Sequence, residues 1–347
     1  MKLLNGYELY EHQKEIIPRG VDIIKRHRFL YLALEVRTGK TLISMGICNS
    51  LNVKKVLFLT TKKAMSSIKG DYSMIASPNF ELEVINYESM HKVSRKGWDL
   101  IVLDEAHGLG AMPKPSKRAK NVKEFIFWND PYIILLSGTP TPESYAQMYH
   151  QVYAIPNNPF YQYPNFYNFA RDYITVVKKV IGNNRYSNCY KRGSIDILNV
   201  MKPYTISKTQ KEAGFDVEIK EHVLEVDMDD QTMKLIKRLR RDRVIMGSKE
   251  VVLADTGIKL MSKIHQMCSG TVKFESGKAM TLNTKKADFI FNHFDGKKIA
   301  IFYKFKQELK ALQQVFGDTL CTELDDFNGT DKHIALQIVS GREGITL

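Results

Sequence analysis

The chain has 347 residues, of which 51 are Lys or Arg and 38 are Asp or Glu, and its formal net charge is +13. This length predicts two domains, and an apolar content of 44% with 26% charged residues excludes wholesale disorder and collagen-like or mucin-like sequence. The longest apolar runs, Phe29–Leu34 and Tyr132–Leu136, are far shorter than the roughly 18 residues of a membrane span, and the first residues do not resemble a signal peptide. We therefore expect a soluble, cytoplasmic protein without a membrane partner.

The cysteines and the basic charge narrow the class of protein further. Cys48, Cys189, Cys268 and Cys321 form no CxxC pair and have no histidine at metal-binding spacing, which argues against a zinc site and against a disulfide framework. The excess of Lys and Arg attracts polyanions, and nucleic acid is the leading candidate. The excess is spread along the chain, so a role in solubility alone remains the alternative.

The first 140 residues predict a buried parallel sheet. Short, nearly continuous apolar runs alternate with helix-length segments, and each run ends in a polar or glycine-containing turn. This pattern is typical of strands that are covered on both faces in an α/β fold. The predicted strands are Phe29–Leu34, Lys55–Thr60, Glu83–Ile85, Leu100–Leu103 and Ile133–Leu136.

The rest of the chain predicts a connection and a second α/β lobe. Tyrosine, phenylalanine, asparagine and proline crowd together after about residue 156, which indicates an irregular, aromatic-packed segment. We divide the chain into a first lobe at residues 1–155, a connection at 156–205 and a second lobe at 206–347. The second lobe has strand candidates at His222–Val226, Lys298–Tyr303, Thr319–Thr322 and Ile334–Val339, and helix candidates at Asp230–Lys249 and Lys259–Cys268.

A phosphate-binding loop follows the first predicted strand. Thr38-Gly39-Lys40-Thr41 lies between that strand and a helix-like segment, where backbone N–H groups and the positive helix end face an anion. Gly39 permits close approach of phosphates, Lys40 reaches the β- and γ-phosphates, and the Thr41 hydroxyl can bind Mg²⁺. The strict pattern has glycine where Leu34 stands, so an ordinary surface turn is the alternative.

A pair of carboxylates follows the fourth predicted strand. Asp104 stands where a fold with such a loop places its Mg²⁺-holding aspartate, and Glu105 can orient and deprotonate a water. A solvated acidic turn is the alternative, but the order of the two motifs favours an ATP site. ATP and Mg²⁺ are therefore the expected ligands.

The motifs together resemble a known family. Gly39-Lys40-Thr41, then Asp104-Glu105-Ala106-His107, then Ser137-Gly138-Thr139-Pro140 resemble motifs I, II and III of superfamily-two helicases and translocases. More narrowly, the chain is similar to the SWI/SNF-like DEAH-type ATPases, especially the compact bacteriophage versions, which would place it in a host cytoplasm. The resemblance implies two RecA-like P-loop lobes and a DNA-dependent ATPase. It also implies adenine contact by Gln13 and coupling of ATP hydrolysis to DNA movement by His107, Ser137, Gly138 and Thr139.

The resemblance also implies which residues face the nucleic acid. DNA is the expected partner, with duplex favoured and single strands or RNA possible, and a replication, recombination or nuclease protein is a possible further partner. Phosphate contacts dominate such binding. The implied contacts are Thr60, Thr61, Lys62, Lys63 and Tyr87 in the first lobe and Ser340, Gly341 and Arg342 in motif V of the second.

Two departures from the family pattern bear on activity. Arg37 stands where most relatives have glycine, and it either adds a cation beside the triphosphate or, as we favour, turns outward toward solvent or a partner. The chain ends at Leu347, inside motif V, so the arginine-bearing motif VI is missing and the second lobe is expected to be incomplete, as in a truncated motor. A non-hydrolysing ATP- or DNA-binding protein is therefore the alternative. A small-molecule kinase is disfavoured because the second and third motifs have no role there.

Overall fold

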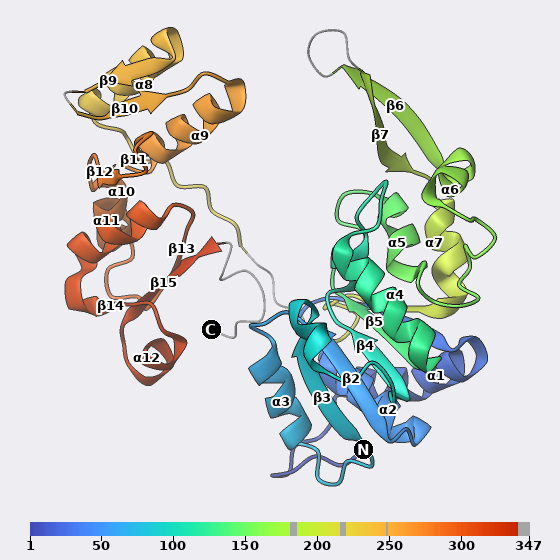
Figure 1. Cartoon of the computed structure of the whole chain (residues 1–347). Coiled ribbons are helices and arrows are strands. Elements are labelled where there is room, and N and C mark those ends of the chain that lie inside the picture. The colour runs from blue at the N-terminus through green and yellow to red at the C-terminus, as the bar shows by residue number, and fades with distance from the viewer. Residues whose placement is uncertain (181–185, 216–219, 248, 339–347) are drawn as a thin grey trace. The chain divides into compact units, whose positions relative to one another are not determined.

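The computed structural model describes residues 1–180, 186–215, 220–247 and 249–338, which divide into two compact units on either side of residues 216–219 (Figure 1). The strands of the first unit are β1 Phe29–Leu34, β2 Lys55–Thr60, β3 Glu81–Asn86, β4 Leu100–Leu103, β5 Tyr132–Ser137, β6 Ile174–Val180, β7 Tyr186–Gly193 and β8 Thr205–Lys208. Its α-helices are α1 Glu11–His27, α2 Lys40–Leu51, α3 Met65–Ser73, α4 Lys117–Asn129, α5 Met148–Val152, α6 Phe166–Tyr173 and α7 Asp196–Met201. Short 3₁₀ turns lie at Tyr87–Lys92, Ala106–Leu109, Tyr145–Gln147 and Lys202–Tyr204.

A parallel sheet of six described strands organises the first unit. The strand order is β3-β2-β4-β5-β1-β8, and every neighbouring pair runs parallel. Leu32 of β1, for example, lies opposite Leu136 of β5 and Ile206 of β8. The five strands expected from apolar runs are confirmed, and the fold is the expected mixed α/β class.

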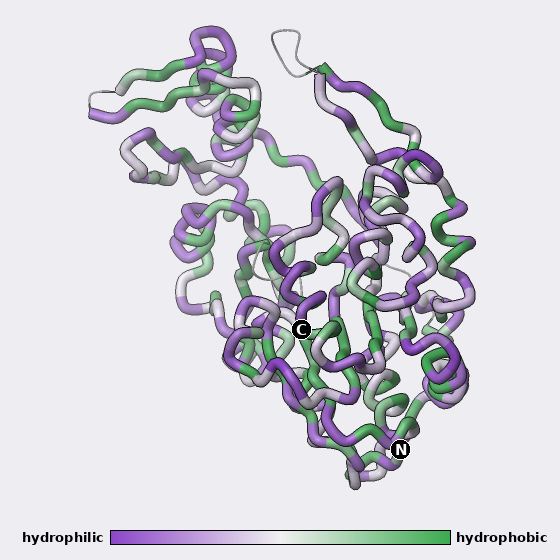
Figure 2. The backbone as a smooth tube through the Cα atoms, turned by 45° about the vertical axis from the view of Figure 1, so that its right-hand side comes forward, coloured by the Kyte–Doolittle hydropathy of each residue, from purple (hydrophilic) through white to green (hydrophobic). Residues whose placement is uncertain are grey.

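Both faces of this sheet are covered, which explains why the strand sequences do not alternate in polarity. On β1, Phe29 and Tyr31 face a core built with α4 to α7, whereas Leu30 and Leu32 face a core built with α1 to α3. All four side chains are fully buried. In Figure 2 the hydrophobic segments gather along these central strands. A helix–sheet–helix sandwich follows, with the carboxyl ends of the parallel strands at one edge.

The aromatic-rich connection belongs to the first unit. Phe160, Phe166 and Phe169 are buried and pack with Tyr149 of α5 in the core on the α4–α7 side. The antiparallel β6–β7 hairpin and α7 follow. The second lobe was expected to begin at residue 206, but Thr205–Lys208 extend the first sheet as β8, so the first unit continues beyond that point.

The second unit has its own parallel sheet of three described strands in the order β13-β15-β14, with two short hairpins, β9–β10 and β11–β12. Its strands are β9 Val244–Met246, β10 Val251–Leu253, β11 Thr271–Lys273, β12 Ala279–Thr281, β13 Ala300–Tyr303, β14 Leu320–Cys321 and β15 His333–Gln337. Its helices are α8 Asp230–Asp242, α9 Gly257–Cys268, α10 Lys285–His293, α11 Lys306–Phe316, the 3₁₀ turn Gly317–Thr319 and α12 Leu324–Gly329.

Two expectations for this unit are wrong. His222–Val226 is not a strand, and its Val223 and Leu224 side chains are exposed because no strand among the described residues pairs with them. The helix expected over Asp230–Lys249 ends at Asp242, where Arg243 adopts a left-handed conformation and the chain turns into β9. Among the described residues, no helix is long and apolar enough to cross a bilayer.

The core of the first unit offers a stability prediction. Leu32 is fully buried between two strands, so Leu32→Ala removes apolar contacts and leaves a cavity. We expect the free energy of unfolding to fall by about 2–5 kcal/mol, measured by denaturant unfolding. Phe127→Ala is the control, because Phe127 of α4 is 76% exposed and its removal should change that free energy by less than about 1 kcal/mol. Equal effects of the two changes would contradict the assigned core.

Candidate active site

The sequence motifs meet at the carboxyl edge of the six-stranded sheet. Gly39 and Lys40 follow β1, Asp104 and Glu105 follow β4, and Gly138 follows β5. Strands β4, β5 and β1 are consecutive neighbours in the sheet. Because parallel strands end at the same edge, segments far apart in the sequence come together there, where ligands of open α/β sheets bind.

Hydrogen bonds from two residues of α1 hold the phosphate-binding loop in place. Thr38 is fully buried, and its backbone carbonyl accepts hydrogen bonds from His12 Nε2 at 2.9 Å and from Gln13 Nε2 at 3.3 Å. The Thr38 hydroxyl donates to the carbonyl of Glu35 at 2.7 Å. These bonds fix the loop before any ligand binds. The role of His12 was not predicted, although its position beside Gln13 is a signal that could have been followed.

Gly39 is required by this geometry for two independent reasons. Its φ is +75°, a left-handed conformation that residues with a Cβ rarely adopt. A Cβ at this position would also overlap the side-chain nitrogen of Gln13. The loop and the first helix are therefore packed as closely as glycine allows.

Gln13, the expected adenine contact, is buried and already bonded within the protein. Its Oε1 accepts from the backbone N–H of Tyr10 at 3.0 Å, while its Nε2 donates to Thr38. A primary amide has two donors and two acceptor lone pairs, so one donor and one lone pair are not used by the described residues. Adenine contact stays a prediction, and bracing the loop is an additional role of this side chain.

Arg37 occupies a position that favours glycine. Its φ is +66° and its side chain is exposed. An exposed side chain fits both an outward orientation and a position beside the triphosphate, so the orientation of Arg37 stays a prediction. The left-handed backbone gives the physical reason why glycine suits this position.

Lys40, Asp104 and Glu105 lie in one electrostatic environment. The Lys40 ammonium acts to lower the pKa of both carboxyls, and it lies 3.6 Å from the point where a Cβ of Gly138 would stand. The amine of the loop, the acidic pair and the segment after β5 therefore share one site. Had the amine and the carboxylates lain in separate pockets, the predicted ATP site could not exist.

Asp104 is a partly buried carboxylate that a hydroxyl group holds in place. Its Oδ2 accepts from the Thr60 hydroxyl at 2.6 Å. Burial raises the pKa of Asp104 to about 6, with a further contribution from the charge of Glu105, while Thr60 and Lys40 oppose the rise. A divalent cation would favour the ionised form of such a group.

The donor set fits Mg²⁺. The carboxylate of Asp104 is a hard oxygen ligand, and the hydroxyl of Thr41, at the first turn of α2, has no hydrogen-bond partner among the residues described. Mg²⁺ is usually held by one or two protein oxygens together with waters and substrate phosphates. These two side chains are the ones that would hold the ion.

Glu105 sits in a constrained turn with His107. Its φ and ψ are 48° and 46°, a left-handed conformation that costs a residue with a Cβ about 1–3 kcal/mol. Its Oε2 lies 3.2 Å from His107 Nδ1, and Nδ1 is also 3.2 Å from the Ser137 hydroxyl. The hydrogen bond from His107, aided by the charges of His107 and Lys40, lowers the pKa of Glu105. Glu105 is therefore ionised and able to accept a proton.

The segment that begins at Ser137 takes part in a buried polar network. The sequence indicated Ser137 but not this network. The Tyr31 hydroxyl donates to Gln151 Oε1 at 2.6 Å, and Gln151 Nε2 donates to the Pro140 carbonyl at 2.7 Å. The Thr139 backbone N–H donates to the Ser137 hydroxyl at 3.2 Å. The segment after β5 is thereby bonded to β1 and α5. Its partners lie far apart in sequence, so no local pattern could reveal them.

Two of the expected DNA contacts are not available to a nucleic acid. Thr60 is fully buried and its hydroxyl binds Asp104; Tyr87 is buried and its hydroxyl donates to the Asp104 backbone carbonyl at 2.6 Å. Both predictions are wrong because these side chains turn inward and support the acidic turn. Thr61 is partly exposed and Lys62 and Lys63 are exposed, whereas Ser340, Gly341 and Arg342 lie outside the described residues.

The raised pKa of Asp104 predicts a pH-dependent stability. The folded protein takes up a proton at this carboxyl between about pH 4 and 6, where the unfolded chain has already lost it, so the free energy of unfolding falls as pH rises through this window. We expect Asp104→Asn to flatten this dependence and to raise stability near pH 7 by up to about 3 kcal/mol. Denaturant unfolding across the pH range measures it. Asp22→Asn, at an exposed position on α1, is the control, and an unchanged profile for Asp104→Asn would contradict the assignment.

Comparison with known proteins identifies the family. The SNF2-related domain matches residues 49–286. The chain belongs to the SNF2-related domain family. The match begins within α2, after the phosphate-binding loop. The assignment of that loop in this SNF2-related chain therefore depends on its own residues and geometry. Membership places the chain in the helicase-like class of nucleic-acid-directed ATPases.

Two solved structures resemble the SNF2-related chain at low identity. The Hef helicase domain of Pyrococcus furiosus has 13% identity and a TM-score of 0.48, covering 96% of this chain and 86% of its own. The ATP-dependent Type ISP restriction-modification enzyme LlaBIII, bound to DNA, has 12% identity and a TM-score of 0.42, covering 95% of this chain and 24% of its own. No curated protein matches the chain.

Proposed function

We propose that this chain is an ATP-dependent motor that couples ATP hydrolysis to movement on, or remodelling of, DNA, with duplex DNA the favoured substrate. Membership of the SNF2-related family supports the class, and the excess of basic residues supports a polyanionic partner. The observation that carries the proposal is the meeting of Lys40, Asp104 and Glu105 at the carboxyl edge of one parallel sheet.

Each residue of this site has a distinct task. The Lys40 ammonium binds the terminal phosphates of ATP, and the backbone around Gly39 approaches them closely. Asp104 and Thr41 would hold Mg²⁺, which when bound neutralises charge on the phosphate oxygens. Glu105 orients the attacking water and accepts its proton, because its lowered pKa keeps it ionised.

The segment after β5 is proposed to report the state of the γ-phosphate. His107 contacts both Glu105 and Ser137, and Gly138 lies against Lys40. A change at the phosphate end can therefore reach the Ser137–Pro140 segment through hydrogen bonds that exchange partners. Thr61, Lys62 and Lys63 in the first unit, with Ser340, Gly341 and Arg342, are proposed as phosphate contacts of the DNA.

Phosphate release with and without duplex DNA tests the proposal. We expect hydrolysis by the unmodified chain to rise with DNA, and Lys40→Ala to lose hydrolysis and bind ATP more weakly, because the amine that neutralises the phosphates is gone. Lys25→Ala is the control, since Lys25 is exposed in the last turn of α1. Hydrolysis that persists undiminished in Lys40→Ala would refute the loop. ATP binding without hydrolysis by the unmodified chain would instead favour a non-catalytic binding protein.

A further inference from the structure

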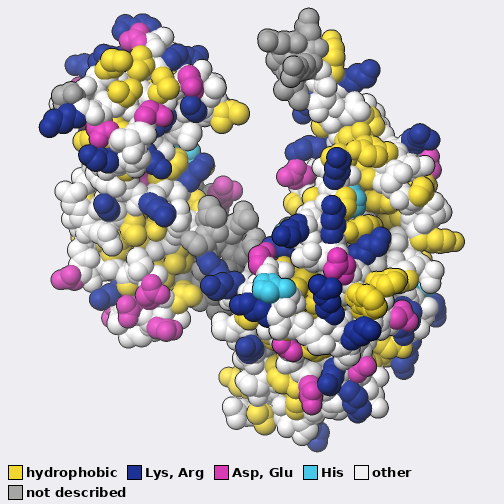
Figure 3. All heavy atoms as spheres, in the orientation of Figure 1, with side chains coloured by type: hydrophobic (Ala, Val, Ile, Leu, Met, Phe, Trp, Pro, Cys, Tyr) yellow, Lys and Arg dark blue, Asp and Glu magenta, His cyan; other side chains and the backbone are white. Residues whose placement is uncertain are grey.

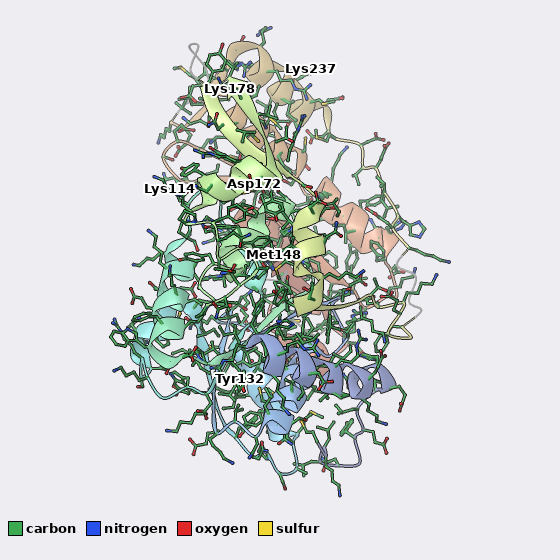
Figure 4. The ribbon with its side chains drawn as sticks, turned by 90° about the vertical axis from the view of Figure 1, so that its right-hand side faces the viewer. Lys114, Tyr132, Met148, Asp172, Lys178 and Lys237 are labelled. Carbon is green, nitrogen blue, oxygen red and sulfur yellow. The ribbon has the colours of Figure 1, made fainter. Side chains whose placement is uncertain are left out.

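The β6–β7 hairpin is a basic arm that the function proposed above does not use. Its strands, Ile174–Val180 and Tyr186–Gly193, contain Lys178, Lys179, Lys191 and Arg192 and no Asp or Glu. The hairpin projects from the first unit beyond α6 (Figure 1), and Figure 4 shows Lys178 far along it, away from Asp172 at the end of α6. A strand pair with only positive charge is suited to a polyanion.

Three of these cations are free to bind a ligand. Lys178, Lys179 and Arg192 are exposed, and none of them forms an ion pair with any residue in the described parts of the chain. Lys191 differs, because its Nζ lies 2.5 Å from Glu143 Oε2 at the base of the hairpin. In Figure 3 Lys and Arg side chains appear on the hairpin and on the surface below it. Exposed cations without a neighbouring carboxylate leave their charge available to an anionic ligand.

The register distributes the charges along the ribbon. Lys178 pairs with Asn188 and Lys179 pairs with Ser187, so these two adjacent cations project from opposite faces of the ribbon and each face carries a positive charge. Tyr186 lies opposite Val180, on the face of Lys178, and is 67% exposed. An exposed aromatic ring among cations is the combination that stacks on an unpaired base while phosphates are neutralised.

The base of the arm is seated firmly on the segment that leaves the candidate active site. A Cβ at Gly193 would lie 2.7 Å from the backbone nitrogen of Ala146, so the two backbones are in close contact. The Ser194 N–H donates to the Tyr173 carbonyl at 2.7 Å, and the Lys191–Glu143 ion pair lies beside them. Glu143 and Ala146 follow Ser137–Pro140 closely in the chain. The base of the arm is thus joined to the segment that follows the carboxyl end of β5.

We propose that the β6–β7 hairpin is a nucleic-acid-binding arm, in which Lys178, Lys179 and Arg192 contact backbone phosphates and Tyr186 stacks on an unpaired base. The inference rests on the proposed function, because it names a surface through which that motor holds its nucleic acid. The arm would be a second nucleic-acid surface, in addition to the one expected at Thr61–Lys63, and would lengthen the protein's contact with the nucleic acid.

Equilibrium binding without ATP tests the arm directly. The probes are labelled duplex DNA, the same duplex with a single-stranded tail, and duplex RNA, measured by fluorescence anisotropy over a range of salt. We expect the triple variant Lys178→Gln, Lys179→Gln, Arg192→Gln to bind duplex DNA with a salt slope smaller by about 2–3, since each lost phosphate contact on B-DNA removes about 0.9. A fourfold rise in salt should then cost the unmodified chain about 40-fold more affinity than it costs the variant.

A matched control removes the same charge from the opposite edge of the sheet. Lys25→Gln, Arg26→Gln, Lys54→Gln changes exposed cations near the amino ends of β1 and β2. This control should keep the full salt slope, and both triple variants should keep the ATPase rate measured without nucleic acid. The charge-conserving variant Lys178→Arg, Lys179→Arg, with Arg192 unchanged, should keep the salt slope of the unmodified chain, because the positive charge is retained.

The stacking role has its own measurement. Tyr186→Leu keeps the apolar bulk and should lower affinity for the tailed duplex about tenfold more than for the blunt duplex. Equal losses on both probes would overturn the stacking role. An unchanged slope for the arm variant, with tight binding by the unmodified chain, would overturn the arm and leave the motor intact, and would point to an acidic protein as its partner. If the unmodified chain binds none of the probes at low salt, the proposed function itself fails.

Discussion

Glu105→Gln is expected to reduce ATP hydrolysis by about 10²–10⁴-fold while nucleotide binding is retained. The amide cannot accept a proton from water, but it keeps the shape of the side chain and can still accept the hydrogen bond from His107, whose Nδ1 lies 3.2 Å from Glu105 Oε2. Single-turnover phosphate release and binding of a fluorescent nucleotide analogue separate the two effects. Because Lys40 and Asp104 are untouched, the variant should accumulate in the ATP-bound state.

Two companion variants make this prediction specific. Glu83→Gln, at an exposed position on β3, should hydrolyse ATP at the unmodified rate. Glu105→Gly should be as inactive as Glu105→Gln yet at least as stable as the unmodified chain, because glycine adopts the left-handed conformation at this turn without steric cost. Normal hydrolysis by Glu105→Gln would place the general base elsewhere.

Gly39→Ala is expected to weaken ATP binding at least tenfold and to lower the free energy of unfolding by about 1–3 kcal/mol. Alanine would have to adopt a φ of +75°, and its Cβ would overlap the Gln13 side chain, so the loop must move away from α1. That movement breaks the bonds from His12 and Gln13 to the Thr38 carbonyl, which hold the loop in place. Nucleotide titration and denaturant unfolding measure the two effects.

Gly97→Ala separates strain from collision. Gly97 also has a positive φ, +97°, but nothing lies within 4 Å of a Cβ there, so only the backbone strain is introduced. Gly97→Ala should lower the free energy of unfolding without weakening ATP binding. Gly39→Ala combined with Gln13→Ala removes the overlap and keeps the strain, so it should recover part of the stability. If Gly39→Ala binds ATP normally, the loop is not the phosphate site.

The sequence alone was sufficient for the framework of the first unit. The apolar runs predicted its five central strands because both faces of a parallel sheet are buried, and local composition is then enough to mark each strand. The order of Gly39–Thr41, Asp104–Glu105 and Ser137–Pro140 along the chain indicated residues that the sheet brings to one edge, since each motif directly follows a strand and parallel strands share their carboxyl ends.

Tertiary structure alone decided the direction in which individual side chains point. Thr60 and Tyr87 were expected to face DNA, yet both turn inward, because their hydroxyl groups bind the carboxylate and the backbone carbonyl of Asp104. The inclusion of Thr205–Lys208 in the first sheet depends on pairing with β1, far away in sequence. His222–Val226 has the composition of a strand, but no strand in the described parts of the chain pairs with it. Side-chain direction and strand pairing are set by contacts between residues far apart in the sequence, and a local sequence pattern cannot predict such contacts.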